Sequence, residues 1–389
     1  MKRCWIHIGM HKTGSTTIQR RLGEIERADG WNYITLEENR RHLNAAMFAM
    51  FASRPRRYHE FRSSGATAED IARKGRVLRG RLERAVREST EENLILSAES
   101  LDQMDSEGVG RLADFLRPHV DDIRVIGYVR PPGGLMSSRF QEKVKHGKRR
   151  FDLSSCTADY RFRFAKYDEV FGRSQVKLVK YDPKSFTNQC VLSDFTERVG
   201  ISLPGSPPAR RLNRRLSRQA CGILYAYNKF GEGFGGGRHA LPENRLLVRS
   251  LSAMEGEKFR LAPELVAAVN ETTSDDIRWM ENRLGTTLDE TMPSGGGIAC
   301  EEDLLRIETA ELQEFARNFE EVVEAAAPPL PESDSLIVPP EQVAACVQSC
   351  GELAAESLRE VEAVPEVRSQ GLLHSLVRRL RQMCGRSRS

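Results

Sequence analysis

The residues nearest the start of the chain that could do chemistry are glycines, a lysine and hydroxyl side chains gathered in one short segment. They are Gly9, Lys12, Thr13, Gly14, Ser15, Thr16 and Thr17. An apolar run from Cys4 to Ile8 precedes them and predicts a buried strand, whereas Ile18 and Leu22 follow them at helical spacing. In a strand, glycine-containing loop and helix, backbone amides and the helix N-terminus converge on an anion. The segment therefore predicts a cradle for a phosphate-type group, to which Lys12 adds a full positive charge.

The position of the lysine restricts the kind of anion. Two glycines five residues apart match the Walker A pattern, but Ser15 stands where that pattern has its lysine, and Lys12 precedes the second glycine. Two apolar runs further along, 93–97 and 123–129, do not end in the aspartate that holds Mg²⁺ in P-loop enzymes. The sequence therefore predicts a phosphate-type anion bound without Mg²⁺, and no metal site.

Polar residues follow two further predicted strands. Glu99 comes just after Asn93–Ser97, and Arg130 comes directly after Ile123–Val129. Ligands of open parallel sheets lie beyond the carboxyl ends of the strands, so both side chains can face one site. Arg130 and Ser138, eight residues later on a predicted helix, can hold one phosphate from two sides. The alternatives are a loop-bracing or helix-capping role for Glu99 and a plain ion pair for Arg130.

These motifs together resemble those of the sulfotransferases, especially a bacterial branch with a His-Lys-Thr-Gly loop. Residues 9–19 resemble the family's 5′-phosphosulfate loop. Tyr128-Val129-Arg130, followed by Pro132 and by Ser138, resembles the family's 3′-phosphate motif. Such enzymes transfer a sulfuryl group from 3′-phosphoadenosine 5′-phosphosulfate (PAPS) to a hydroxyl or amine. The resemblance covers roughly residues 1–290 and departs from the family near 52–67, where an Arg-rich insertion lies.

The resemblance implies a role for each matching residue. Lys12 would contact the bridging and sulfuryl oxygens of the PAPS co-substrate. Glu99 would accept the acceptor's proton, with His11 as the alternative base. The implied cofactor-binding residues are Lys12, Thr13, Gly14, Ser15, Thr16, Thr17, Arg130, Ser138 and Arg214. Arg214 belongs to a basic run that could equally face solvent or an acidic acceptor.

The predicted fold class is α/β, with a P-loop-like central parallel sheet flanked by helices and an all-α C-terminal extension. The predicted division is a sulfotransferase-like domain over 1–290, a linker with an acidic helix and a Pro-rich stretch over 291–340, and a helical amphipathic tail over 341–389. Three local expectations complete this outline. Ser53–Thr67 is expected to be a mobile loop, and Leu261–Leu284 and Glu301–Ala325 are each expected to be one helix.

Composition places the chain among soluble globular proteins. Of 389 residues, 39% are hydrophobic and 29% charged. No apolar run approaches the ~20 residues of a membrane span, and no signal peptide precedes the first strand, so we expect a cytoplasmic protein. The eight cysteines are scattered and are interpreted as reduced structural thiols.

The net charge of +4 conceals a strong asymmetry. Residues 301–366 carry seventeen acidic and three basic side chains, whereas six arginines and no acid follow Val367. The first 300 residues are therefore net basic, which suits an anionic cofactor and an anionic acceptor. The chain has no zinc finger, basic zipper or RNP pattern, so no nucleic-acid partner is expected. A basic amphipathic helix near 370–383 could lie on the inner membrane surface, on the acidic helix or on a partner protein.

The predicted function is sulfuryl transfer from PAPS to a hydroxyl or amine of an acceptor, with a glycan or polysaccharide favoured by the basic body. Two other classes of function compete with it. One is a Mg²⁺-dependent P-loop kinase or NTPase, against which the position of Lys12 and the missing aspartate argue. The other is a non-catalytic scaffold that keeps the fold and uses its tail for partners.

Overall fold

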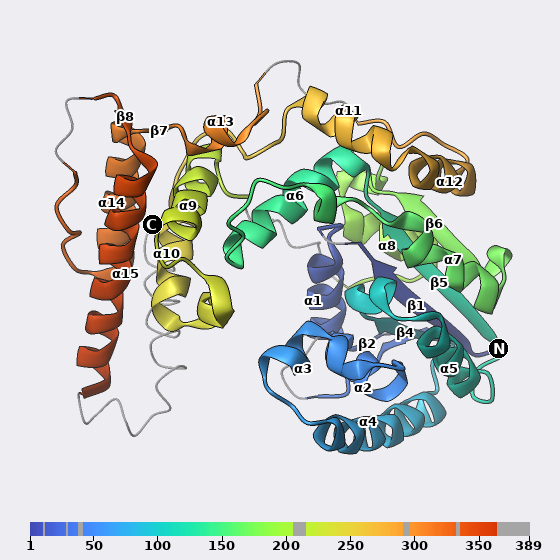
Figure 1. Cartoon of the computed structure of the whole chain (residues 1–389). Coiled ribbons are helices and arrows are strands. Elements are labelled where there is room, and N and C mark those ends of the chain that lie inside the picture. The colour runs from blue at the N-terminus through green and yellow to red at the C-terminus, as the bar shows by residue number, and fades with distance from the viewer. Residues whose placement is uncertain are drawn as a thin grey trace. The chain divides into compact units, whose positions relative to one another are not determined.

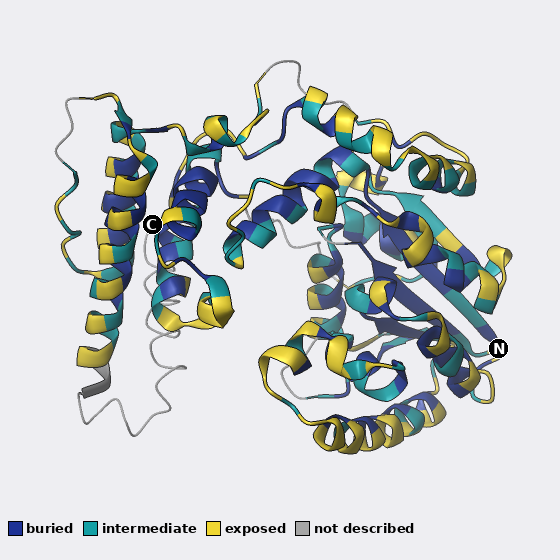
Figure 2. Cartoon of the chain, viewed as in Figure 1, coloured by how far each residue is buried: buried dark blue, intermediate teal, exposed yellow. Residues whose placement is uncertain are grey.

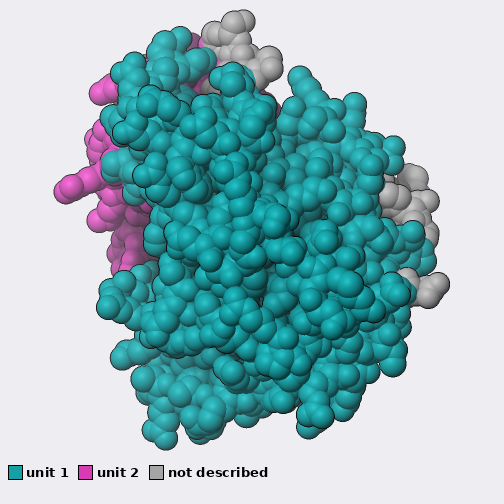
Figure 3. Space-filling model, turned by 90° about the vertical axis from the view of Figure 1, so that its right-hand side faces the viewer, with its two compact units in different colours: residues 1–139, 153–214, 263–295 teal, residues 140–152, 215–262, 296–389 magenta. Residues whose placement is uncertain are grey.

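The structure is a computed structural model of the chain. It describes residues 1–10, 12–28, 30–37, 42–204, 215–290, 296–331 and 335–363. The chain forms two compact units, which Figure 3 colours separately. Unit 1 comprises residues 1–139, 153–214 and 263–295, and unit 2 comprises residues 140–152, 215–262 and 296–389. Each unit is made of three separate segments of the chain, so the units do not correspond to the predicted domains. The predicted boundary at residue 290 therefore stays a prediction.

Unit 1 is built on a six-stranded sheet in the order β2-β3-β4-β1-β5-β6 (Figure 1). The strands are β1 (Arg3–Gly9), β2 (Arg27–Ala28), β3 (Trp31–Tyr33), β4 (Asn93–Ser97), β5 (Asp122–Val129) and β6 (Val176–Lys180). All neighbouring strands pair in parallel except β2, which pairs antiparallel with β3 at the edge. The predicted α/β class with a central parallel sheet is confirmed.

Helices cover both faces of this sheet. The α-helices in unit 1 are α1 (Ser15–Ile25), α2 (Asn44–Phe51), α3 (His59–Ser63), α4 (Ala68–Glu88), α5 (Ser106–Leu116), α7 (Tyr160–Phe171), α8 (Val191–Val199), α11 (Pro263–Thr272) and α12 (Ser274–Leu284). Helix α6 (Pro132–Lys145) begins in unit 1 and continues into unit 2. Its first residue is a proline, which is common at this position because the amide that proline lacks has no partner in a first turn.

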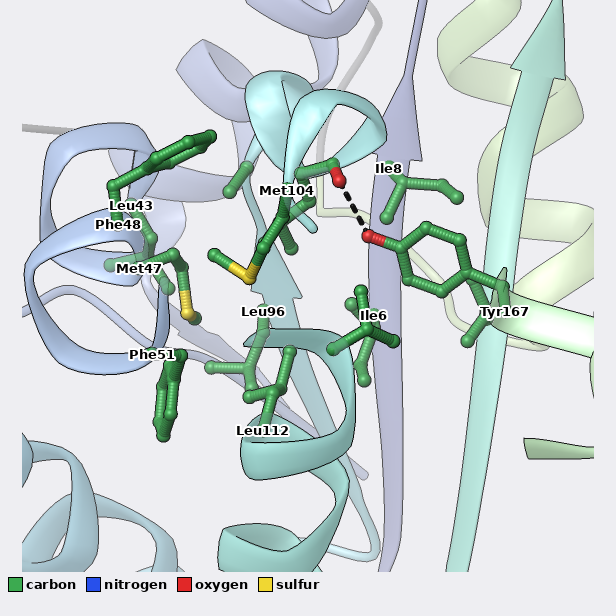
Figure 4. Close-up of a cluster of buried hydrophobic side chains, with 14 of the residues drawn as sticks. Ile6, Ile8, Leu43, Met47, Phe48, Phe51, Leu96, Met104, Leu112 and Tyr167 are labelled. Atoms are coloured by element: carbon green, nitrogen blue, oxygen red, sulfur yellow. Dashed lines mark hydrogen bonds between the residues drawn. The ribbon is translucent and has the colours of Figure 1, made fainter. Parts of the chain in front are cut away.

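Alternation along β1 divides the core into two layers, because successive side chains of a strand point to opposite faces. Ile6 and Ile8 pack against residues of α2, α5 and α7, and Figure 4 shows part of this layer. In it, Tyr167 of α7 donates a hydrogen bond to the Leu101 carbonyl, 2.6 Å away. Trp5 lies on the other face, in a second cluster that includes residues of α1 and α8. Apolar side chains from helices therefore pack against both faces of the sheet.

Unit 2 is mainly helical. Its α-helices are α9 (Arg218–Phe230), α10 (Pro242–Ala253), α13 (Glu301–Leu305), α14 (Thr309–Val323) and α15 (Pro340–Ala363). Helix α15 packs against α9 and α10. A short antiparallel ladder joins β7 (Ile307–Glu308) to β8 (Ile337–Val338), so the C-terminal extension is not all-α as predicted. Among the described residues, no helix is long and apolar enough to cross a membrane.

Three local predictions were wrong. Ser53–Thr67 is not a structureless loop, because η1 (Pro55–Arg57) and α3 are anchored by the buried rings of Tyr58 and Phe61. The predicted helix 261–284 is two helices, α11 and α12, separated at Thr273. The predicted acidic helix 301–325 is divided into α13 and α14 by β7. The predicted basic helix near 370–383 lies outside the described residues.

Candidate functional site

The carboxyl edge of three neighbouring central strands brings the predicted site residues together. Strand β1 pairs with β4 in the register His7 with Ser97, and with β5 in the register Gly9 with Tyr128. Glu99 therefore follows β4 at the level where β1 ends, and Arg130 follows β5 just beyond that level. Because the strands are parallel, both side chains belong to the edge from which the glycine loop departs.

The loop between β1 and α1 contains two left-handed backbone conformations. Lys12 has φ 62° and Gly14 has φ 84°. Only glycine adopts this region routinely, so the lysine conformation is costly and needs support from its surroundings. The Oγ1 of buried Thr13 donates a hydrogen bond to the Met10 carbonyl, 2.7 Å away. Thr13 is thus held to the end of β1, and Gly14 leads directly into the N-terminus of α1.

Gly9 lets the loop fold back onto the end of β1. A Cβ at this position would lie 2.7 Å from Ser15 Oγ, 3.3 Å from Thr13 Oγ1 and 3.9 Å from Glu99 Cγ. Glu99, Thr13 and Ser15 therefore gather around one glycine. Ser15 is 2% exposed, and its buried hydroxyl has no hydrogen-bond partner among the described residues. A buried hydroxyl without a partner is unfavourable, so this atom marks a place where a polar ligand would be stabilised.

The N-terminus of α1 is suited to an anion. No side chain caps it, and its first turn contains no acidic residue. Gly14 at the N-cap packs against α8, because a Cβ there would lie 2.6 Å from Val191 Cγ1. The first amides of α1 carry the positive end of the helix dipole. A bound phosphate-type group would complement both the amides and the dipole.

Arg130 contacts the loop between β1 and α1. Its side chain is buried, with 4% of the residue exposed. The guanidinium donates to the Lys12 carbonyl over 3.4 Å, and the backbone amide lies 3.4 Å from Met10 Sδ. Tyr160 of α7 donates to the Arg130 carbonyl over 2.6 Å. The predicted anion-binding arginine therefore lies beside the predicted anion-binding loop.

The structure describes some of the remaining predicted site residues and not others. Ser138, eight residues after Arg130, lies on helix α6 as expected and is buried, with 5% exposed. Thr16 is exposed and Thr17 half-buried in the first turn of α1. The other predicted residues, His11 and Arg214, lie outside the described residues. The roles assigned to all these residues stay predictions.

Sequence reasoning missed a buried polar chain beneath the loop. His7 Nδ1 lies 2.8 Å from Ser97 Oγ, and Gln19 of α1 donates to the same oxygen over 3.1 Å. All three side chains are buried, and burial lowers the pKa of His7 to about 3. The chain links β1, β4 and α1 directly below the site. The sequence feature that could have indicated it is a histidine in an otherwise apolar strand. Hydrophobic periodicity alone does not show which partners such a histidine has.

A buried charged cluster next to Glu99 was also missed. Glu99 opens the short 3₁₀ helix η2 (Glu99–Gln103), which contains the buried Asp102. Arg163 of α7 donates to the Asp102 carboxylate, and Lys166 donates to the Asp102 carbonyl over 2.8 Å. Burial raises the pKa of Asp102 and lowers that of Lys166 to about 8. Helix α7 therefore fixes the turn that carries Glu99.

A further acidic residue, which the sequence did not indicate, contacts the first turn of α6 from a distant segment. Glu290 Oε2 accepts a hydrogen bond from the Gly134 amide, with an N–O distance of 2.7 Å. Glu290 follows α12 by six residues and belongs to no helix or strand, so no periodic pattern could place it. Its carboxylate lies at the positive end of the α6 dipole.

A cavity of about 400 Å³ contains none of the predicted site residues. It lies between α1 and α8 and is lined by Arg21, Leu192, Ser193, Thr196, Glu197 and others. No group of three or more histidine, cysteine, aspartate or glutamate residues within the described part of the chain could hold a metal ion.

Comparisons with known proteins give only distant likeness. No protein-family model matches the chain, and no curated protein matches it. Among solved structures, the chain is similar to a sulfotransferase from Alicyclobacillus acidocaldarius, with 13% sequence identity and a TM-score of 0.39. The superposition covers 74% of this chain and 97% of that chain. The function proposed below therefore depends on the geometry around the loop.

Proposed function

We propose that the chain is a sulfotransferase that uses PAPS and acts on a hydroxyl or amine of an acceptor. The observation that carries this proposal is the buried, unpartnered hydroxyl of Ser15 at the uncapped N-terminus of α1. It lies in a loop whose lysine precedes the second glycine, and Arg130 contacts that loop. This arrangement supports an anion held by backbone amides, a hydroxyl and a guanidinium together.

The residues present fit a ligand with two phosphate groups. The loop and the start of α1 suit the 5′ end of PAPS, where the transferable sulfuryl group is attached by a phosphosulfate anhydride. Arg130 and Ser138 suit its 3′-phosphate. Because Arg130 lies against the Lys12 carbonyl, one ligand could contact the loop and this arginine at the same time. The requirement for a 3′-phosphate would separate PAPS from ATP.

Two side chains would assist the transfer itself. Lys12 would stabilise negative charge that develops on oxygens at the reacting end of the ligand. Glu99, whose Cγ lies beside Gly9, would accept the proton of the attacking hydroxyl. Helix α7 holds the backbone of η2 and thereby limits the positions that the Glu99 carboxylate reaches.

Mutation of Lys12 tests this proposal. Lys12→Ala should lower PAP release from PAPS, in the presence of mixed hydroxylated glycan acceptors, by about a hundredfold or more. Its free energy of unfolding should change little, because Lys12 is half-exposed. Lys177→Ala on β6 removes the same charge from an exposed position and serves as the matched control. Activity of Lys12→Ala within a few-fold of the wild type would refute the role given to Lys12.

The competing functions predict different results. A Mg²⁺-dependent kinase or NTPase would bind ATP with Mg²⁺ in preference to PAP, the desulfated product. A scaffold would bind PAP and show no turnover with any acceptor. The acceptor class that we favour within the sulfotransferase proposal is a glycan or polysaccharide, because the first 300 residues are net basic.

A further inference from the structure

One segment of unit 1 has a strong local excess of basic side chains. Residues 53–87 carry eleven arginine or lysine side chains and four acidic ones, whereas the whole chain has a net charge of only +4. The segment comprises η1, α3 and α4 (Figure 1). Figure 2 shows exposed positions along the outer side of α4 and over α3. A local excess of this size attracts polyanions from solution.

The arginines at the start of this segment stand on a rigid support. Tyr58 and Phe61 are buried, with 7% and 6% exposed, and the Tyr58 ring stacks on Phe48 of α2 at 4.5 Å between centroids. These aromatic anchors alternate with exposed arginines. The exposed residues are Arg54, Arg56, Arg57 and Arg62. Rigid presentation lowers the entropy that several guanidinium groups lose when they bind one ligand.

Some basic side chains of α4 already have partners in the fold. Arg73 pairs with Asp70 at 2.7 Å, and Lys74 pairs with Glu37 at 2.8 Å. The guanidinium of Arg79 lies 4.9 Å from the centroid of a phenylalanine ring of α5. Six arginines have no carboxylate within 4.0 Å among the described residues: Arg54, Arg56, Arg57, Arg62, Arg76 and Arg84. Unpaired guanidinium groups are available for carboxylates of a ligand.

A short helix connects this basic segment to Glu99. Helix α2 begins beside η2, where the Leu43 amide donates to the Ser97 carbonyl over 3.0 Å and the Ser100 amide donates to Asn44 Oδ1 over 3.3 Å. The eight residues of α2 span about 12 Å, and Arg54 follows its last residue by three positions. The basic segment is therefore within reach of an extended polymer that enters the candidate site.

We infer that the arginines of η1 and α3 bind the acceptor, and that the acceptor is a polysaccharide carrying uronate carboxylates. This inference rests on the proposed function and adds the surface that selects the acceptor. An acceptor that has not yet been sulfated needs other anionic groups to bind guanidinium, and uronate carboxylates supply them. Arginine binds carboxylates with two parallel hydrogen bonds, while neighbouring sugar hydroxyls stay available for sulfation.

Other polyanions fit the surface less well. Single-stranded nucleic acids stack their bases on exposed aromatic rings, but Tyr58 and Phe61 are buried. A membrane-binding surface needs apolar side chains to insert between lipids, and Val77 is the large hydrophobic residue that this segment exposes, at 53%. The surface offers charge and hydrogen bonds with little apolar area, as polysaccharides require.

Titration of the full chain with oligogalacturonate tests the inference. A variant that combines Arg54→Ser, Arg56→Ser, Arg57→Ser and Arg62→Ser should lose at least tenfold in affinity, and its affinity should depend less on salt concentration. The matched control combines four exposed arginines, one directly after α5 and the others in α7, η4 (Arg173–Gln175) and α12: Arg117→Ser, Arg161→Ser, Arg173→Ser and Arg278→Ser. The control removes the same net charge and should keep its affinity for oligogalacturonate within about twofold. Salt screens charges that lie far from the bound ligand, so the control arginines contribute little to binding.

Several results would overturn the inference. They are no binding of oligogalacturonate by the wild type, equal loss in both variants, and tighter binding of duplex DNA or of anionic phosphatidylglycerol vesicles at the same salt concentration. PAP titration of the same proteins separates this surface from the cofactor site. The η1 and α3 variant should bind PAP as the wild type does. Loss of PAP binding in this variant would show that its effect is not confined to the acceptor.

Discussion

Glu290 and Arg130 both lie against Gly134 in the first turn of α6. A Cβ on Gly134 would be 2.5 Å from Glu290 Oε1 and 3.5 Å from Arg130 Nη2. The Glu290 carboxylate also accepts the Gly134 amide hydrogen bond. An internal carboxylate thus lies next to the arginine that we assign to a phosphate of the ligand. This arrangement places a negative charge where an incoming anion would be repelled.

Glu290→Gln should therefore tighten PAP binding. Removing one negative charge near a helix N-terminus and an arginine should raise affinity several-fold, because such charges are worth about 0.3–1 kcal/mol. Calorimetric titration with PAP measures the change. Asp289→Asn, at the exposed neighbouring position, removes the same charge and should have a smaller effect. Unchanged or weaker PAP affinity in Glu290→Gln would contradict the assignment of Arg130 to an anion.

Gly14→Ala should disrupt the loop by a steric clash as well as by backbone strain. Gly14 and Gly30 have nearly equal φ angles, +84° and +82°, but only Gly14 has an atom within 4 Å of a Cβ position, at Val191. Gly30→Ala therefore measures the backbone penalty alone, about 1–2 kcal/mol. We expect Gly14→Ala to be less stable than Gly30→Ala in urea unfolding and to lose PAP binding.

A second substitution tests the cause of that loss. Val191→Ala in the Gly14→Ala background removes the Cγ1 atom that a new Cβ would meet. It should recover part of the stability and part of the PAP affinity. If the double variant is no better than Gly14→Ala, the contact between the loop and α8 does not position the loop.

Acid should destabilise the fold through His7. The folded state keeps His7 neutral down to about pH 3, whereas the unfolded chain takes up a proton near pH 6.5. Between these values the unfolded state binds more protons, so stability falls as the pH falls, by about 1.4 kcal/mol per pH unit at most. Urea unfolding from pH 6.5 to pH 4 should show a shallower pH dependence for His7→Gln than for the wild type. Parallel pH profiles would show that His7 does not contribute this linkage.

The buried charges beneath Glu99 should be strongly coupled. Asp102→Asn leaves buried Arg163 without its carboxylate partner and removes the negative charge near buried Lys166, so it should cost about 3–5 kcal/mol in the free energy of unfolding. Lys166→Met added to Asp102→Asn removes one of the two cations and should recover part of that loss. A double-mutant cycle in urea measures the coupling. Additive effects would mean that these residues do not form one electrostatic cluster.

Strands β1, β4 and β5 at the centre of the sheet were well predicted because each is a short apolar run. Strand β4 has the bounds that the sequence predicted, and β1 and β5 extend theirs by two residues and one. A capping box formed by Thr67 and Asp70 likewise marks the start of α4 in the sequence. Local patterns of this kind determine where an element begins and ends.

Other features depend on contacts that no local pattern records. Residues 53–67 have the composition of a loop, but Tyr58 and Phe61 find a core partner in α2 and fold the segment. Thr273 ends α11 before α12 begins, although the apolar spacing continues across both helices.

Some residues of the candidate site could likewise be predicted from local sequence patterns, and others could not. Its loop, Glu99 and Arg130 were identified from motifs, because their position at strand ends is a property of the sequence. Glu290 and the cluster around Asp102 were not, because each meets its partners only after distant elements pack together. The supporting residues of a site are therefore harder to predict than the residues expected to contact its ligand.

The most direct test of the sulfotransferase assignment is calorimetric titration of the full chain with PAP, beside AMP and ATP with Mg²⁺. We predict metal-independent PAP binding that is much tighter than AMP binding and is abolished by Arg130→Ala. Such a result would establish a site that requires the 3′-phosphate. Preference for ATP with Mg²⁺, or PAP binding that Arg130→Ala leaves unchanged, would contradict it.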